Sequence, residues 1–440
     1  MINSLEEARK EINRIDKEMA RLFEERMASA KVIAEYKRDN NLPIFDAKRE
    51  AELTERNSQY INSPELLEDY KDFLSEMINV SKAYQGRILF GEERVRRIDG
   101  ATVMPISFGE RSYDIHIEGG SLQGMAKIFG IEKKRAFIIT DKGVPEEYAR
   151  AVASGFSDSY IYTVNQGEGS KSLETYREIT EKMVELGITR SDICIAVGGG
   201  VVGDLTGFVA ATYMRGVDFY NVPTTLLSMV DSSIGGKTAV NHGGVKNIVG
   251  AFHQPKGVLI DINTLDTLPK RHLSNGMAES IKMAATSNAA LFSLLENSKE
   301  DDIESIIIES LKIKRGVVEA DEHEGGIRKI LNFGHTFGHA VEAATNMEEL
   351  YHGECVAIGM MAVTEGDVKK RLERVLEKYN LPTEYKGDAL EALSLIKSDK
   401  KRSGDTIDAV FVPEIGHGEI RKIEISDFWE TVKKNLGGKI

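Results

Sequence analysis

Residue types that bind metal ions gather in the C-terminal half of the sequence. His335 and His339 lie four residues apart in the run NFGHTFGH, and His352 follows within HGE. Upstream, Glu279 precedes Lys282 by three residues. Two histidines and a carboxylate around an open coordination position form the ligand set of a catalytic Zn²⁺ site. Spacing alone favours His335 and His339 as the histidine pair.

Two glycine-rich segments have the composition of phosphate-binding turns. Residues 198–204, GGGVVGD, follow a β-rich run and open a predicted helix, where glycines let a pyrophosphate approach backbone N–H groups. The segment does not have the GxGxxG spacing, and tight packing of the strand against the helix explains its glycines about equally well. Residues 167–171, GEGSK, form a second polar glycine turn that could meet a nucleotide.

A third glycine-rich region carries more charge. Lys237, Lys246 and Asn247 lie on glycine-rich loops, and Arg215 ends the helix that follows residues 198–204. Point charges and flexible backbone donors of this kind suit a phosphorylated substrate. The spacing of a P-loop is not met, and the loop that leads to Lys237 begins with Asp231, so ATP binding is disfavoured.

The elements that must position these residues alternate between strand and helix from about residue 104. Short β-rich runs, each followed by a polar or glycine turn, predict an α/β layer with a parallel sheet. These runs are residues 136–140, 193–197, 219–222 and 258–260. After about residue 268 helical patterns dominate, as in 301–320 and 336–344, so the second half of this region is expected to be helical.

The first 85 residues contain no glycine and have helical spacing. Ser4 and Glu7 form a capping box for a first helix that reaches about residue 40. Such a helix is roughly 55 Å long, too long for a module of this size, so we expect it to pair with a partner chain. Pro43 stops it, a second helix follows through about Ser58, and a third begins at Ser63 and continues to about residue 85.

Polar residues interrupt the apolar stripes of these helices. Arg26 and Lys37 occupy stripe positions on the first helix, and Ser81 and Gln85 do so on the third. Buried cations are costly without an anionic partner, so the pattern predicts a carboxylate or an anion inside the module. A coiled coil with interior ion pairs, or frayed helix ends, explains the periodicity about equally well.

Composition limits the classes of function. The 440 residues predict two or three domains, and a formal net charge of −13 repels nucleic acid and anionic membrane surfaces. Two cysteines, Cys194 and Cys355, are too few for a disulfide framework and suit the cytoplasm. The N-terminus has no apolar signal core, and glycines and Asp204 interrupt the most apolar stretch, so we expect neither export nor a membrane span.

The first 86 residues resemble the all-helical chorismate mutases. The matching residues, in order, are Arg9, Arg26, Lys37, Asp46, Arg49, Glu50, Ser81 and Gln85. The resemblance implies an intertwined homodimer, or a higher homo-oligomer, that converts chorismate to prephenate. It implies that Arg9 of the partner chain, Arg26 and Arg49 grip two carboxylates, that Lys37 and Gln85 donate to the ether oxygen, and that Glu50 holds a hydroxyl. A dimerising or regulatory module without catalysis is the alternative.

The remainder resembles 3-dehydroquinate synthase through GGGVVGDLTGFVAATYMRG, VPTTLLSMVDSSIGGKTAVN, GMAESIK, NFGHTFGHA and HGE. The resemblance implies a Rossmann-like NAD-binding α/β part at 104–268 and an all-α part with metal and substrate residues at 269–440. A linker is expected at 87–103, after the helical module at 1–86. It also implies a divalent metal ion, Zn²⁺ or Co²⁺, held by Glu279, His335 and His352. His339 then becomes a substrate and proton-transfer residue instead of a ligand.

The same resemblance implies conversion of 3-deoxy-D-arabino-heptulosonate 7-phosphate to 3-dehydroquinate and phosphate. The implied substrate residues are Asp231, Lys237, Lys246, Asn247, Lys282, Lys314, Arg328, Asn332 and His339, with Arg215 reaching the phosphate and one of Lys400 and Lys401 in contact with substrate. The implied NAD residues are Asp141, Glu168, Lys171, Gly199, Gly200, Val201, Val202, Gly203, Asp204, Thr224, Thr225, Lys237, Lys246 and Thr267. Another sugar phosphate cyclase, or more distantly a metal polyol dehydrogenase, is the alternative.

Overall fold

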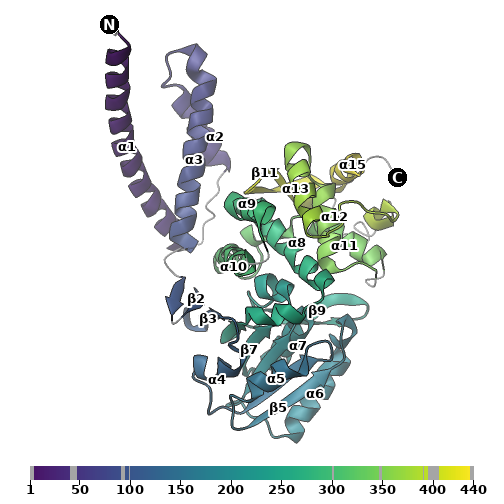
Figure 1. The fold of residues 1–440 in the computed structure, drawn as a ribbon. Helices are drawn as coiled ribbons and strands as arrows, with labels where there is room; N and C mark the ends of the chain where they lie inside the picture. Colours follow the sequence, from purple (N-terminus) through teal and green to yellow (C-terminus); the bar gives the residue numbers. More distant parts are fainter. Residues whose placement is uncertain are drawn as a thin grey trace. The chain divides into compact units, whose positions relative to one another are not determined.

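The computed structural model (Figure 1) describes residues 4–39, 47–90, 95–98, 100–299, 302–345, 349–389, 391–394 and 406–436. Contacts divide the chain into two compact units, Met1–Val95 and Arg96–Ile440. Within the described ranges, no helix combines the length and the apolar character that a membrane crossing requires.

The first unit consists of the three predicted helices. They are α1 (Leu5–Asp39), α2 (Ala47–Ser58) and α3 (Leu67–Phe90). The hydroxyl of Ser4 accepts a hydrogen bond from the backbone N–H of Glu7 at 3.1 Å, as the capping motif predicts. A 3₁₀ turn, Pro64–Leu66, precedes α3, so the proline lies where its missing N–H costs least.

Only the C-terminal part of α1 is buried within this unit. Its buried side chains are Met27, Ala30 and Ala34, and α3 contributes buried Leu74 and Ile78. The apolar residues nearer the start of α1 are between 42% and 68% exposed in this chain, namely Leu5, Ile12, Ile15, Met19 and Leu22. The stripe predicted for α1 is therefore covered along only part of its length.

The second unit is built on an eight-stranded sheet in the order β1-β2-β3-β10-β7-β6-β4-β5. The strands are β1 (Arg96–Ile98), β2 (Ala101–Ile106), β3 (Tyr113–Ile117), β4 (Ala136–Asp141), β5 (Ser159–Val164), β6 (Ile193–Gly198), β7 (Asp218–Pro223) and β10 (Gly257–Ile260). The six from β3 to β5 in this order pair in parallel, whereas β1, β2 and β3 pair antiparallel. The four predicted strands are confirmed as β4, β6, β7 and β10.

The expected linker at 87–103 has regular structure at both ends. Helix α3 continues to Phe90, and β1 with the first residues of β2 occupies much of the rest. The charged sequence of β1 hides its strand character, because all three of its residues are exposed at the edge of the sheet.

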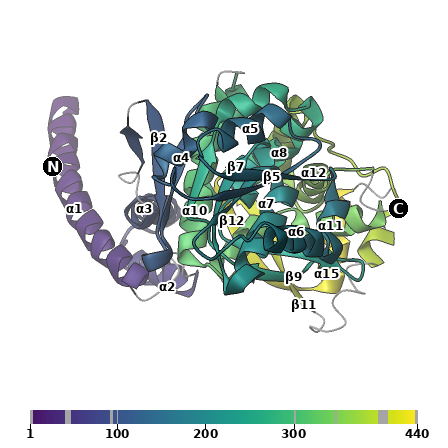
Figure 2. The ribbon, with the colours of Figure 1, turned by 90° about the horizontal axis from the view of Figure 1, so that it is seen from below.

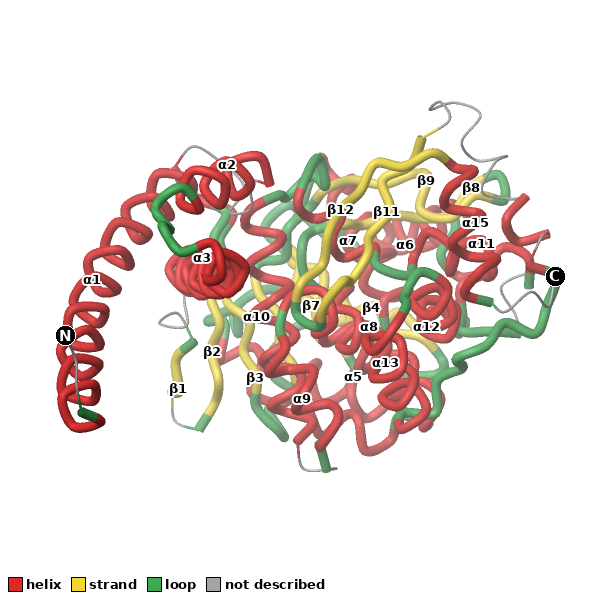
Figure 3. The backbone as a smooth tube through the Cα atoms, turned by 90° about the horizontal axis from the view of Figure 1, so that it is seen from above, coloured by secondary structure: helices red, strands yellow, loops and turns green. Residues whose placement is uncertain are grey.

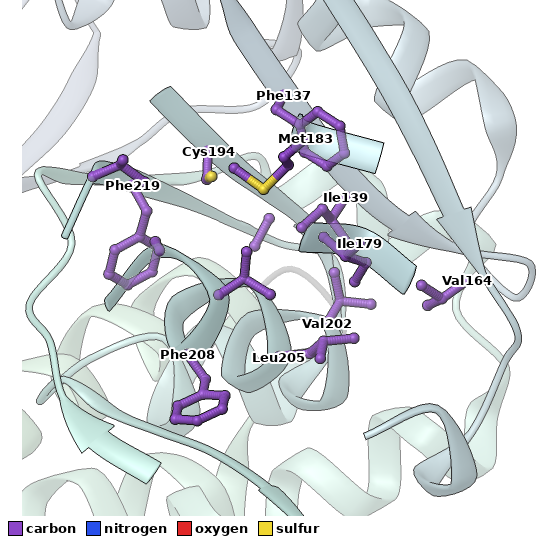
Figure 4. Close-up of a cluster of buried hydrophobic side chains, with 14 of the residues drawn as sticks. Phe137, Ile139, Val164, Ile179, Met183, Cys194, Val202, Leu205, Phe208 and Phe219 are labelled. Carbon is purple, nitrogen blue, oxygen red and sulfur yellow. The ribbon is translucent and has the colours of Figure 1, made fainter. Parts of the chain in front are cut away.

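Helices cover both faces of the sheet, since alternate residues of each strand point to opposite sides. On one face Phe137 and Ile139 of β4 pack with α6 (Leu173–Glu185) and α7 (Gly200–Thr212), as Figure 4 shows. On the other face Ile138 packs with α4 (Met125–Ile128) and α5 (Glu146–Ala153). Figure 2 shows α5 on one side of the strands and α6 and α7 on the other.

The C-terminal part is mainly helical, as predicted. Its helices are α8 (Lys270–Ser287), α9 (Ala289–Asn297), α10 (Ile303–Ala320), α11 (His335–Ala344), α12 (His352–Ala362), α13 (Gly366–Lys378) and α15 (Ile425–Asn435). It also contains a hairpin that the helical prediction misses, β11 (Thr406–Glu414) with β12 (His417–Glu424), visible in Figure 3. Gly416 has a φ of 89° in its turn, a left-handed conformation that favours glycine.

A second hairpin, β8 (Lys237–His242) with β9 (Val245–Phe252), carries lysines of the glycine-rich loops. Gly243 and Gly244 join the two strands with φ values of 60° and 77°, which a two-residue hairpin turn requires. The strand before it, β7, leads into a π-helical turn over Ser228–Ser232. Turns of this type are frequent at functional sites.

Helices α11 and α12 approach each other so closely that only glycine fits between them. A Cβ atom on Gly359 would lie 1.8 Å from the carbonyl oxygen of Gly334, and one on Gly338 would lie 2.8 Å from that of Cys355. This backbone contact brings His335, at the start of α11, beside His352, at the start of α12.

Gly359→Ala should therefore destabilise the second unit by about 1–3 kcal/mol, the usual cost of overpacking. The measurement is urea unfolding followed by circular dichroism. Gly124→Ala is the control, because its new Cβ would meet only Ile128 at 3.5 Å, an ordinary contact. Equal stability of the two variants would contradict the close contact.

Candidate functional site

The histidines predicted as metal ligands lie together at the start of two helices and are joined by a carboxylate from a third. Nitrogen atoms of His335, His339 and His352 lie within 4.8 Å of one another. Glu279, on α8, places its Oε1 atom 3.7 Å from Nε2 of His335 and 3.5 Å from Nε2 of His352. Two sets of three could therefore surround one small cation: the three histidines, or Glu279 with His335 and His352. His335 and His352 belong to both sets.

Glu279 is the most buried member of this cluster, at 1% exposed. Its Oε2 accepts a hydrogen bond from Lys282 on the same helix, but its buried Oε1 has no hydrogen-bond partner. Burial by itself would raise the pKa of Glu279, yet the charge of Lys282 and the nearby imidazoles of His352 and His335 hold that pKa well below its usual range. An ionised, unsatisfied carboxylate oxygen that faces two imidazoles fits a divalent metal ion.

The two imidazoles nearest Glu279 differ in protonation. Burial and the charge of Lys282 lower the pKa of His335 well below its usual value, so its ring is neutral, as a metal ligand must be. Burial would also lower the pKa of His352, but the adjacent carboxylates of Glu279 and Glu342 raise it to about 9. Binding a metal ion at Nε2 would replace that proton.

An ion pair between a buried lysine and a partly buried aspartate lies near this cluster. Asp231, in the π-helical turn, accepts a hydrogen bond from Lys314 of α10 at 2.5 Å. Burial would raise the pKa of Asp231, but Lys314 lowers it, so the carboxylate is ionised. Burial lowers the pKa of Lys314, and the charge of Arg328 acts in the same direction. The residues predicted to meet substrate thus form a compact set with both signs of charge.

Glu324 joins two further predicted substrate residues. It accepts hydrogen bonds from Lys237 and, at 3.0 Å, from the amide of Asn332. Its backbone has a φ of 60°, uncommon for glutamate and typical of residues held by a site. Nearby, Arg328 is 2% exposed and donates to the carbonyl oxygens of Glu322 at 2.5 Å and Gly235 at 3.4 Å.

A cavity of about 530 Å³ opens beside Glu324 and Asn332. Lys329 and, from the β11–β12 hairpin, Asp408 and Lys422 also line it. This volume is in the range of small-molecule sites.

A residue of the β8–β9 hairpin contacts a carboxylate beside the histidine cluster. Lys246 donates to Glu342 of α11 at 2.6 Å. Asn247 has a φ of 55°, and its backbone N–H donates to the side chain of Asn241 at 2.9 Å. Arg215 is exposed, and among the described residues no hydrogen bond or ion pair joins it to this cluster.

The predicted nucleotide residues follow neighbouring parallel strands. Asp141 ends β4, Gly199 caps α7 directly after β6, and Thr224 follows β7. Because the carboxyl ends of parallel strands meet at one edge of a sheet, these residues converge there. The N–H groups at the start of α7 point out of this edge, an arrangement that binds anions.

Other nucleotide candidates form a polar border to this edge. Lys171, 5% exposed, contacts Asp204 at 2.5 Å, and Glu168 accepts from Asn241 at 2.8 Å. Thr267 shares a hydrogen bond with Tyr148 at 2.8 Å. Val202 is an exception within the glycine-rich segment, because its side chain is fully buried in the core, and so only its backbone could face a ligand. Gly200, Val201 and Gly203 form the first turn of α7, and Thr225 hydrogen-bonds Ser228.

In the first unit, three residues of the predicted mutase set are buried or half-buried on α1 and α3. Arg26 is half-buried and donates to the carbonyl oxygen of Met77 at 3.4 Å. Ser81 and Gln85 are buried on α3, and Oε1 of Gln85 has no hydrogen-bond partner. A buried polar atom without a hydrogen-bond partner, as on Gln85, requires an explanation, and an unfilled polar pocket is one.

The other members are exposed, partly buried or outside the description. Arg9 is exposed, Lys37 is partly buried, and Arg49 is exposed with Glu52 at 3.8 Å. Glu50 lies in α2, but its side chain is not described. Asp46, Lys400 and Lys401 lie outside the described residues.

Comparison with known proteins identifies both units. The chain is 42% identical over 354 residues to 3-dehydroquinate synthase of Streptococcus thermophilus, a match that covers 75% of this chain and 99% of the relative. The chain belongs to the 3-dehydroquinate synthase family. Family models for the 3-dehydroquinate synthase N-terminal and C-terminal parts match residues 161–275 and 276–402, and the chorismate mutase type II model matches residues 8–86. The synthase of Prochlorococcus marinus is 41% identical over 342 residues, covering 72% of this chain and 94% of that one.

Solved structures support the same family and the predicted fold. A 2-deoxy-scyllo-inosose synthase complexed with carbaglucose-6-phosphate, NAD⁺ and Co²⁺ aligns with a TM-score of 0.67 and 25% identity, over 76% of this chain and 100% of that one. ValA, a 2-epi-5-epi-valiolone synthase from Streptomyces hygroscopicus with NAD⁺ and Zn²⁺, aligns with a TM-score of 0.69 and 26% identity, over 76% and 99%. The enzyme classes predicted from the sequence, 3-dehydroquinate synthase with an N-terminal chorismate mutase, are confirmed.

Two carboxylates of the synthase unit were missed by sequence reasoning. Glu342 could have been found, because it follows His335 by seven residues and His339 by three, and so shares their helix face. Glu324 gives no such signal, since it lies in a charged loop, and only the folded chain brings it to Lys237.

Lys171→Met leaves Asp204 of the synthase unit without its cationic partner, and so it should lower the free energy of unfolding. Removing one partner of a buried ion pair costs about 3–5 kcal/mol, measured by urea unfolding at neutral pH. Burial already holds the pKa of Asp204 above its usual value against the opposing charge of Lys171. A raised folded-state pKa means that stability is lost as pH rises through it, so the deficit should shrink as the pH is lowered and Asp204 is protonated.

The control is Lys182→Met, which breaks an exposed pair with Glu185 and should change stability by less than about 1 kcal/mol. A deficit of Lys171→Met that does not vary with pH would contradict the assignment to Asp204.

Proposed function

We propose that the second unit converts 3-deoxy-D-arabino-heptulosonate 7-phosphate to 3-dehydroquinate and phosphate, with NAD and a divalent metal ion, Zn²⁺ or Co²⁺. The observation that carries this proposal is the buried, unpartnered oxygen of Glu279 facing His335 and His352. Family membership supports the reaction, and the related cyclases with NAD⁺ and Co²⁺ or Zn²⁺ support the cofactors.

Different residues of this chain would bind the metal ion and NAD. Glu279, His335 and His352 would hold the metal ion, and the strand ends around Gly199 and Asp141 would hold NAD. When bound, NAD accepts and returns a hydride while the metal ion polarises a substrate oxygen. The protein itself orients the substrate and places charged groups around it. These are the main contributions of a protein site to the reaction of a multiply charged sugar.

Cations held by carboxylates prepare the site for a phosphorylated, carboxylated substrate. Lys237 and Lys246 are each paired with a glutamate, and Lys314 with Asp231. These ion pairs hold the lysine ammonium groups in place before the substrate binds. The bound substrate can then accept the hydrogen bonds that the ammonium groups donate to the carboxylates. His339, the most exposed of the three histidines, is positioned to exchange a proton with the bound substrate.

A different sugar phosphate cyclase activity is the second candidate for this unit. The aligned inosose and valiolone synthases have the same fold, and their structures also contain NAD⁺. Sequence identity favours dehydroquinate synthase activity, because the chain is 42% identical to a 3-dehydroquinate synthase but 25% and 26% identical to the inosose and valiolone synthases.

The full chain, loaded with NAD and Zn²⁺, should release phosphate from the heptulosonate phosphate and form dehydroquinate. His352→Ala should lower the rate by about 10³-fold, because metal polarisation is worth several kcal/mol. The control, His417→Ala, alters a histidine at the start of β12 that is outside the residues lining the cavity and should keep the wild-type rate. Phosphate release with a different cyclic product would favour the second candidate, and no phosphate release by folded, loaded protein would refute the proposal.

We also propose that the first unit converts chorismate to prephenate as an intertwined dimer with a second copy of the chain. Half-buried Arg26 and the unpartnered Gln85 oxygen support a polar pocket on α1 and α3. A pericyclic rearrangement needs no nucleophile, only a held conformer and donors at the breaking C–O bond. The uncovered apolar stripe of α1 supports the dimer. The alternative is a dimerising or regulatory module without catalysis.

Gln85→Ala should abolish most chorismate turnover, because loss of one donor at a developing oxyanion costs about 10²–10³-fold in kcat. Loss of chorismate is followed by ultraviolet absorbance, and prephenate is identified by chromatography. Gln59→Ala, at an exposed position after α2, is the matched control. No turnover by folded wild-type protein would instead favour the non-catalytic module.

A further inference from the structure

Glu342 connects two parts of the synthase site that come from distant segments of the chain. It lies on α11, is 8% exposed, and has both carboxylate oxygens engaged. Oε1 accepts from Lys246 at 2.6 Å, and Oε2 lies 3.4 Å from Nδ1 of His352. One buried carboxylate thus contacts a predicted substrate residue and a predicted metal ligand.

The two nitrogens of His352 face different partners. Nε2 points to Oε1 of Glu279 at 3.5 Å, on the side where a metal ion would bind, and Nδ1 points to Glu342. A neutral imidazole that ligates a metal ion through Nε2 carries its proton on Nδ1. A carboxylate that accepts this proton in a hydrogen bond fixes both the tautomer and the orientation of the ring.

Lys246 holds Glu342 from the opposite side. It belongs to β9, 96 residues earlier in the chain, and its ammonium group compensates the charge of a carboxylate that would otherwise be buried with only a histidine beside it. His335 and Glu342, seven residues apart, also share one face of α11, so this helix presents a ligand and a support together.

We propose that Glu342 is a positioning residue that holds His352 with Nε2 directed at the metal site, and that Lys246 keeps Glu342 in place. The inference rests on the proposed function, because it requires Glu279, His335 and His352 to bind the metal ion. It adds a residue that touches neither substrate nor metal and acts on the metal site through His352.

The test is metal affinity, measured on the full chain. Metal-free protein is titrated with Zn²⁺ in competition with a coloured chelator, and with Co²⁺ to record its visible absorption. Glu342→Gln keeps the size of the side chain and should weaken Zn²⁺ binding about 10–100-fold and change the Co²⁺ spectrum. The matched control is Glu296→Gln, which breaks a glutamate pair with Arg371 at 2.7 Å elsewhere in the unit and should leave both readouts unchanged.

His352→Ala separates failure of this inference from failure of the metal site. Wild-type affinity in His352→Ala would refute the proposed metal site itself. Weakened binding in His352→Ala with normal binding in Glu342→Gln would overturn only the role of Glu342. In the His352→Ala background, adding Glu342→Gln should cause no further loss, whereas an equal loss in both backgrounds would indicate a general charge effect and overturn positioning.

Folding is checked by NAD binding and by the thermal unfolding temperature of each metal-free variant. If Glu342→Gln does not fold, Glu342→Asp serves in its place, since it keeps the charge but withdraws the carboxylate from His352. Its Zn²⁺ affinity should also fall, and wild-type affinity in Glu342→Asp would overturn the inference.

Discussion

A buried carboxylate with one oxygen that no protein group hydrogen-bonds lies at the centre of the synthase unit. Glu279 is almost fully buried, receives one hydrogen bond from Lys282, and leaves its other oxygen facing His335 and His352. Burying such an anion is costly unless a cation completes its surroundings. The close approach of α11 and α12, through Gly334 and Gly359, brings the two imidazoles to it.

The same charge balance extends through the rest of the site. An acidic chain with a net charge of −13 must bind anionic substrates by local cations, and here each important lysine is held by a carboxylate. Asp231 holds Lys314, Glu324 holds Lys237, and Glu342 holds Lys246. Such pairs orient long side chains before substrate binds, which reduces the entropy that binding must overcome.

Local patterns predicted most of the elements but not those that depend on distant contacts. The capping box of Ser4, the three N-terminal helices and four parallel strands follow from periodicity and capping, which act over a few residues. The β11–β12 hairpin and the edge strand β1 were missed, because half-exposed strands have mixed sequences and are stabilised by their pairing.

The sequence by itself determined the family, the two-part organisation and the residue types available for chemistry, because these reside in motifs of contiguous residues. Only the tertiary structure decided which of them meet. Spacing favoured His335 with His339, and the family resemblance implied Glu279 and His352, whereas the fold shows that Glu279 from α8 and His352 from α12 meet His335. Glu324 emerges only as the partner of a lysine far away in the chain. The neighbours of a side chain on other helices depend on how the helices pack, and the spacing of residues along the sequence does not specify this packing.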